Sequence, residues 1–208
     1  MNTGDILNIV VSILTIAIAV VALFQTNKQI TLSNKQHLFD RRLDKYLLVK
    51  DLIALYATNR ESIMEKDLYM KCGLILRWLL NCKKLESMMS FIENPLNVEA
   101  KNNFLSKCEE LEKAGEEIVL LWQEPFAETA SQFVKKFCFL LQEMYKQHRG
   151  YVTVKKRVKE WNGTSVDVDT QMKKLAGKLF LICKETDSVY EKIVEDNIEQ
   201  KMKSSLRL

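Results

Sequence analysis

Glycine and proline are scarce in this sequence, which has only six glycines and two prolines among 208 residues. Neither type occurs anywhere between residues 5 and 72. Because both residues interrupt helices and form tight turns, their scarcity predicts long helices joined by few turns. Charged residues make up 28 % of the chain, which is typical of helices with one solvated face. The predicted fold class is therefore all-α.

Histidine is the rarest of the residues that commonly carry chemistry. His37 and His148 are the two in the chain, and they fall on different predicted helices. His37 is expected to be solvated, and His148 to lie near a helix end, where a cation suits the helix dipole. The sequence has no H-E-x-x-H, G-x-S-x-G, Walker A or G-x-G-x-x-G motif. We therefore predict that the protein is not an enzyme.

The five cysteines are odd in number and widely spaced, with no C-x-x-C and no neighbouring histidine. This pattern is typical of reduced, buried thiols in a reducing compartment rather than of disulfides or metal ligands. We expect no metal site and no cofactor. The cysteines are Cys72, Cys82, Cys108, Cys138 and Cys183.

Charge is missing altogether from residues 6–27, ILNIVVSILTIAIAVVALFQTN. A helix of this length rises about 33 Å, enough to cross a hydrocarbon core of about 30 Å. Residues 1–27 are therefore predicted to form a transmembrane helix. Ala17 and Ala19 form an A-x-A pattern that would suit signal-peptide cleavage, but no basic segment precedes the apolar run, which continues to Phe24.

Lysine and arginine are absent before this helix and frequent after it, beginning with Lys28 and Lys35. The positive-inside rule then predicts a single-pass membrane protein with the large domain in the cytoplasm. Its N-terminus lies outside, and the rest of the chain is cytoplasmic.

Polar and small residues of the predicted membrane helix follow one another at steps of three and four. Such spacing places them on one narrow stripe of the helix. In lipid, a stripe of this kind forms a helix–helix seam or the wall of a wet pore. The remaining alternative is a monomeric anchor whose hydroxyls bond to their own helix. The stripe comprises Asn8, Ser12, Thr15, Ala19 and Ala22.

The rest of the chain predicts a multi-helix bundle. A stalk helix is expected over residues 28–57, followed by a cytosolic bundle over residues 58–208. Thr58 and Glu61 have the spacing of a capping box, which predicts that a helix starts there and reaches about residue 91. Asn94 and Pro95 interrupt the pattern. Further helices are expected over residues 98–123, 126–148 and 168–203. Gly150 is expected to end the second of these, leaving 151–161 as a short helix or extended connector and 161–169 as a loop.

A basic run lies after Gly150, flanked by Tyr151 and Trp161. It could contact an RNA backbone or anionic lipid headgroups, and Lys135 and Lys136 could extend it. It could equally be an ordinary solvated surface. The run consists of Lys155, Lys156, Arg157 and Lys159.

The stretch LFDRRLDKYLLVKDLI, directly after the membrane helix, resembles a group of small bacterial membrane proteins. They share one N-terminal span and a stalk of the form L-F-x-x-R-x-x-x-Y, which here is Leu38, Phe39, Arg42 and Tyr46. In size and layout the chain is most similar to the membrane accessory proteins of type VI-B CRISPR systems. These act beside an RNA-guided RNA-cleaving effector in antiviral defence. The resemblance implies a homo-oligomeric, ring-shaped pore that depolarises the inner membrane.

Members of that family were suspected of a divergent HEPN-type nuclease site, in which a histidine follows an arginine by four to six residues. Neither His37 nor His148 has an arginine at that distance before it. We therefore expect a non-enzymatic pore-forming accessory or effector protein that assembles with its own copies in the membrane. The resemblance adds an RNA-guided CRISPR effector as a partner and leaves nucleic-acid binding open. The alternatives are a membrane-anchored RNA- or protein-binding module without pore activity, and an effector gated by a nucleotide second messenger.

Overall fold

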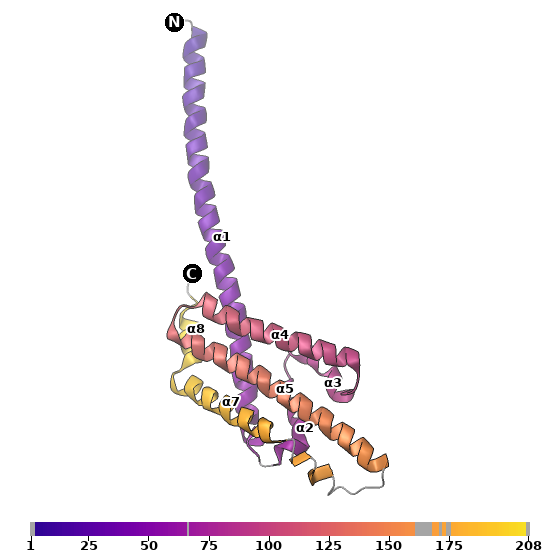
Figure 1. Cartoon of the computed structure of the whole chain (residues 1–208). Helices are drawn as coiled ribbons and strands as arrows, with labels where there is room; N and C mark the ends of the chain where they lie inside the picture. Colours follow the sequence, from indigo (N-terminus) through magenta and orange to yellow (C-terminus); the bar gives the residue numbers. More distant parts are fainter. Residues whose placement is uncertain (1–2, 66, 161–167, 171, 174–175, 207–208) are drawn as a thin grey trace. The chain divides into compact units, whose positions relative to one another are not determined.

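The computed structural model describes residues 3–65, 67–160, 168–170, 172–173 and 176–206 (Figure 1). Near the N-terminus, solvent exposure is described for Gly4 and then from Val11 onward. The described helices share one pattern, in which long helices alternate with short connections. They are α1 (Thr3–Ile63), α2 (Leu68–Leu79), the 3-10 helix η1 (Glu86–Met88), α3 (Ser90–Glu93), α4 (Val98–Leu121), α5 (Pro125–Glu160), α7 (Gly177–Glu195) and α8 (Ile198–Ser204). No strand occurs in the described ranges, which confirms the all-α prediction.

The chain divides into two compact units, one containing residues 1–41 and one containing residues 42–206. In the first unit, α1 carries the apolar segment predicted from the sequence. Among the described residues it is the one helix long and apolar enough to cross a membrane, with a mean hydropathy of 1.6 in its most apolar window and none of that window buried.

The second unit is built around α5, which packs against α2, α4, α7 and α8. Figure 1 shows α4 and α7 running beside α5. The core is mainly aromatic and aliphatic, with Phe104 stacked on Tyr145 at a centroid distance of 4.7 Å and Tyr56 edge-on to Phe133 at 5.9 Å. The second half of α1 contributes Leu52 and Tyr56, both fully buried.

A smaller hydrophobic cluster lies under the C-terminal end of α5. Its buried members are Tyr69, Val158, Val168, Met172 and Ala176. Tyr69 also donates a hydrogen bond to Asp169 at 2.8 Å, which joins α2 to Asp169 at this end of the unit.

Thr58 does not start a helix, so the capping-box prediction is wrong. The Thr58 hydroxyl donates to the Ala54 carbonyl at 2.9 Å, and α1 continues to Ile63. Tyr56 and Ile63, on either side of Thr58, are both fully buried. Their burial holds the segment helical, and the next helix begins only at Leu68.

Gly150 does not end α5, and residues 151–160 continue the same helix. A glycine inside a helix costs about 1 kcal/mol relative to alanine. Packing of Tyr151, Val154 and Val158 on the smaller cluster offsets that cost. The predicted loop lies almost wholly outside the described residues.

The break at Asn94 and Pro95 is confirmed. Helix α3 ends at Glu93, and α4 begins at Val98 with the Asn97 side chain accepting a hydrogen bond from the Ala100 amide at 3.0 Å.

The predicted last helix is instead divided into α7 and α8, because Asn197 adopts a left-handed conformation with φ of 50°. Asparagine tolerates this conformation better than most residues.

Candidate functional site

The polar stripe predicted from the sequence lies on the apolar segment of α1. The Thr15 hydroxyl donates to the Val11 carbonyl at 2.8 Å, and Thr26 donates in the same way to Ala22 at 2.9 Å. Hydroxyls bonded to their own helix can face lipid, water or another helix without an unsatisfied donor. Ala19 and Ala22 are exposed, and the Asn8 side chain lies outside the described part of the chain. A helix–helix seam and a pore wall therefore both remain predictions for the role of this stripe.

The apolar side chains of the same helix segment are uncovered. Their exposed fractions lie between 45 % and 73 %. An apolar surface of this extent is not stable in water and needs lipid or further helices to cover it. The exposed residues are Val11, Ile13, Leu14, Ile16, Ile18, Val20, Val21, Leu23 and Phe24.

The two second-unit residues of the L-F-x-x-R-x-x-x-Y motif have structural roles. Arg42 donates from Nε and Nη2 to the Leu121 carbonyl at 3.0 and 2.8 Å, and its guanidinium lies 5.8 Å from the Trp122 ring centroid. Arg42 thus satisfies a terminal carbonyl of α4, while Tyr46 is buried. Leu38 is exposed and Phe39 half-buried.

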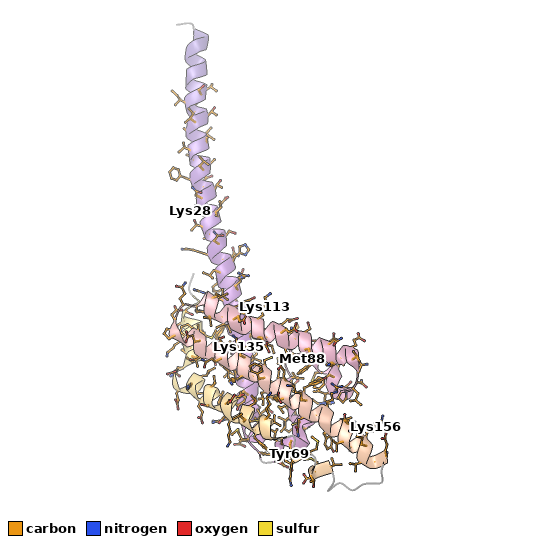
Figure 2. The ribbon with its side chains drawn as sticks, in the orientation of Figure 1. Lys28, Tyr69, Met88, Lys113, Lys135 and Lys156 are labelled. Carbon is orange, nitrogen blue, oxygen red and sulfur yellow. The ribbon has the colours of Figure 1, made fainter. Side chains whose placement is uncertain are left out.

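The basic run forms an exposed surface at the end of α5. Lys155, Lys156, Arg157 and Lys159 are all exposed (Figure 2 labels Lys156), and none forms an ion pair with another described residue. Val158 is buried in the smaller cluster, so it does not interrupt the charged surface. Lys155 lies 5.7 Å from the Tyr151 ring centroid. This end of α5 therefore carries four exposed positive charges without an ion-pair partner among the residues that the structure describes.

Lys135 and Lys136 do not add free charge to this surface. Lys136 pairs with Glu185 of α7, and Lys135 lies 3.9 Å from Glu116 of α4. Their charges are compensated by neighbouring helices.

A polar cluster that the sequence did not indicate joins α1 to α7. Arg60 binds Asp187 through two hydrogen bonds of 2.6 and 2.9 Å and Glu191 through one of 2.6 Å. Tyr56 donates to the same Asp187 carboxylate at 3.2 Å. Arg60 lowers the pKa of Asp187, whereas burial, followed by Asp187, raises the pKa of Tyr56. The cluster is a structural ion-pair network. Arg60 and Asp187 are 127 positions apart in the sequence, so no local spacing pattern predicted their contact.

His148 is not a cation at a helix end, as the sequence had suggested. It lies inside α5, with Nε2 3.3 Å from the Ile92 carbonyl and its ring against Phe91. A Cβ on Gly73 of α2 would lie 2.5 Å from its Nδ1, so the ring fits only because residue 73 is glycine. Burial lowers the pKa of His148, which favours the neutral imidazole. Its role is to pack α5 against α2.

Four of the five cysteines are buried, and Cys82 is half-buried. Burial raises the pKa of Cys72, and it raises that of Cys183 to about 12. The pKa of Cys138 is raised by its interaction with Cys108 and by burial. Within the described ranges no group of histidine, cysteine or carboxylate side chains could hold a metal ion.

We expect Cys82 to be the only thiol that N-ethylmaleimide modifies rapidly in the folded protein. The thiolate is the reactive form, and burial shields the other four thiols from the reagent. A raised pKa further suppresses the thiolates of Cys72, Cys138 and Cys183. Intact-mass measurement should show one adduct on the native protein, none on Cys82→Ser at the same time, and five after unfolding. Several adducts forming at similar rates on the native protein would contradict this arrangement.

A groove of about 380 Å³ between α1 and α4 is lined by charged side chains of both signs. They are Lys45, Lys84, Lys107, Lys113, Asp44, Glu110 and Glu117. Lys45 pairs with Glu117 at 2.8 Å and Lys84 with Asp44 at 3.7 Å, and Lys107 pairs with Glu110. Lys113, labelled in Figure 2, is the one lining lysine without a carboxylate partner among the described residues. The other lysines described in this groove are therefore already paired with carboxylates.

Comparisons with family models, with curated proteins and with solved structures gave no match.

Proposed function

We propose that this protein is a membrane-anchored, non-enzymatic homo-oligomer that forms a pore in the bacterial inner membrane. It would act as an accessory or effector protein of CRISPR-type anti-phage defence and depolarise that membrane. The observation that carries the pore is the stripe of α1, which is polar and small on a helix whose other side chains are exposed and apolar. The assignment to antiviral defence rests on the L-F-x-x-R-x-x-x-Y resemblance.

Asn8 is the residue of the stripe whose side chain would cost the most free energy if it faced lipid. An asparagine side chain facing lipid leaves amide groups without partners, whereas a seam or a lumen supplies them. Thr15 needs no such partner, because its hydroxyl already bonds to Val11. The energetic argument for assembly therefore rests on the N-terminal part of the stripe.

The orientation follows from the basic residues after the membrane helix. Lys28 and Lys35 favour the cytoplasmic side, so the N-terminus lies outside and the helical unit inside the cell. The helical unit would then contact further copies of the chain, and the RNA-guided effector, from the cytoplasm.

The double variant Asn8→Leu, Thr15→Leu tests the pore. We expect it to be expressed and inserted normally but to lose membrane depolarisation, measured with a potential-sensitive dye in cells. A matched control, Ile13→Leu with Val20→Leu, changes only the apolar side and should depolarise like the wild type. Unchanged depolarisation in the first variant would contradict a polar lumen or seam.

The mass of the detergent-solubilised protein is the second measurement. A closed oligomer is expected for the wild type and for the apolar-side control. A monomer across the concentrations that depolarise membranes would exclude the pore.

The second candidate function is a membrane-anchored module that binds RNA, and the four uncompensated cations of α5 favour it. Four phosphate contacts to single-stranded RNA would give a slope of about −3 in log affinity against log salt. Lys155→Gln, Lys156→Gln and Arg157→Gln together should abolish that binding, whereas the ion-paired Lys135→Gln should not. Loss of RNA binding with depolarisation retained would separate the two functions.

A further inference from the structure

A second groove, here named the α1–α2 groove, lies between the C-terminal part of α1 and the end of α2. Its volume is about 500 Å³, within the range of about 300 to 1,000 Å³ that is usual for small-molecule sites. Its lining comes from two segments that are about twenty residues apart in the sequence. The lining residues are Asp51, Ala54, Leu55, Thr58, Asn59, Trp78, Asn81 and Cys82.

Asp51 gives the groove its charge. Among the described residues no lysine or arginine lines the groove, and Asp51 forms no ion pair with any of them. The lysine-lined groove on α4 differs in this respect, because its carboxylates are already paired. A half-buried, unpaired carboxylate selects a positively charged ligand group.

Asn59 supplies a hydrogen-bond acceptor to the groove. Its side chain is only 9 % exposed, and its amide nitrogen donates to the Leu55 carbonyl at 2.8 Å. The amide oxygen receives no hydrogen bond from the described residues. This oxygen lines the groove and can accept a hydrogen bond from an N–H group of a ligand.

Trp78 supplies an aromatic surface. Its side chain is 41 % exposed although it is large and apolar, and it lines the same groove as Asp51. Indole is the aromatic group that binds cations best through its ring face. The groove thus combines a carboxylate, an amide oxygen and an indole, which together suit an alkylammonium group.

We propose that the α1–α2 groove binds the alkylammonium group of a ligand, with Asp51 opposite the charge, Trp78 over the alkyl part and Asn59 accepting an N–H. This site is independent of the pore and of the basic run of α5. The ammonium group can belong to a free amine or to a lysine of a second copy of this chain, and the test distinguishes the two.

Cys82 lines the groove and is a built-in reporter of its occupation. The rate of Cys82 modification by N-ethylmaleimide is measured on the full-length protein in detergent, at pH 7, by intact mass. We compare 1,4-diaminobutane with sodium chloride at equal ionic strength, so that screening is matched. The diamine is expected to slow the modification, and sodium chloride is not.

Asp51→Asn keeps the shape of the side chain and removes its charge. Loss of one charge-assisted contact should raise the diamine concentration needed for half-protection about tenfold. Glu61→Gln, which removes an exposed carboxylate of α1 outside the groove, should behave like the wild type. Trp78→Leu should also weaken protection, and it serves as a second variant if Asp51→Asn alters folding.

A dilution series without amine identifies the source of the ammonium group. If Cys82 becomes protected as the protein concentration rises, and Asp51→Asn removes this protection, a lysine of a second copy occupies the groove. The proposal is overturned if neither the diamine nor the protein itself protects Cys82. It is also overturned if Asp51→Asn is protected as well as the wild type.

Discussion

Replacing Trp122 by alanine is expected to lower the free energy of unfolding of the helical unit by about 4 kcal/mol. Trp122 is only 1 % exposed and directly follows the last residue of α4. Its indole Nε1 donates to the Ser205 hydroxyl at 2.6 Å, and the Arg42 guanidinium lies over its ring. The side chain therefore joins α4 to the second half of α1 and to the end of α8, and alanine loses all three contacts.

The measurement is urea unfolding of the full-length protein in detergent, followed by helical circular dichroism. Trp122→Phe retains most of the apolar contact but leaves Ser205 without its donor, so its loss should be about 1 kcal/mol. Trp78→Ala is the matched control, because that tryptophan is substantially exposed and its loss should stay within about 0.5 kcal/mol. Equal midpoints for Trp122→Ala and Trp78→Ala would show that Trp122 does not hold the unit together.

Replacing Arg60 by alanine is expected to cost about 2 kcal/mol, less than a fully buried pair because the arginine is 37 % exposed. The cost arises because Asp187, whose side chain is 14 % exposed, is left without its partner. The double variant Arg60→Ala, Asp187→Asn removes both charges and should recover part of the lost free energy of unfolding. Arg77→Ala, on the exposed side of α2, should leave the unfolding midpoint unchanged.

The same pair makes stability depend on pH. Arg60 lowers the pKa of Asp187 in the folded state, so the unfolded chain binds this proton first as the pH falls. The pair's contribution to the free energy of unfolding is fully present above the pKa of Asp187 in the unfolded chain, about 3.9, and therefore at neutral pH. This contribution is lost as the pH falls through the lower pKa of Asp187 in the folded state. Arg60→Ala should therefore lose less stability on acidification than the wild type. An identical acid dependence in the two proteins would mean that Asp187 does not depend on Arg60.

The sequence predicted those parts of the fold that local patterns determine. The apolar run of α1, the break at Pro95 and the start of α4 each follow from neighbouring residues. Gly150 and Thr58 misled the prediction because the groups that decide their conformation come from elsewhere. Val168, Met172 and Ala176 pack with Val158 in the smaller cluster at the end of α5 beyond Gly150. In α1, Tyr56 is packed against Tyr190 of α7, which keeps the helix continuous around Thr58.

The candidate sites likewise contain some features that the local sequence predicts and others that depend on contacts between distant segments. The exposure of Lys155 and Lys156 followed from their sequence, because charged residues on a helix default to solvent. The buried position of Val158, which makes that surface continuous, needed the smaller cluster. The α1–α2 groove could not have been predicted at all, since Asp51 and Trp78 share no motif and meet only through helix packing. Arg42 was noticed as part of a motif, but its partner, the Leu121 carbonyl, is 79 residues away.

The ion pair of Arg60 with Asp187 and the bond of Trp122 to Ser205 also bear on the order in which the chain can fold. Their partners are separated by 127 and 83 residues, so neither contact can form until nearly the whole chain has left the ribosome. Until then Leu52 and Tyr56, fully buried in the finished unit, remain uncovered on the nascent chain. Closing such long loops is slow, and exposed apolar surface in the interval favours aggregation. Biosynthesis of this protein should therefore depend on chaperones that hold the nascent chain until α7 and α8 are complete.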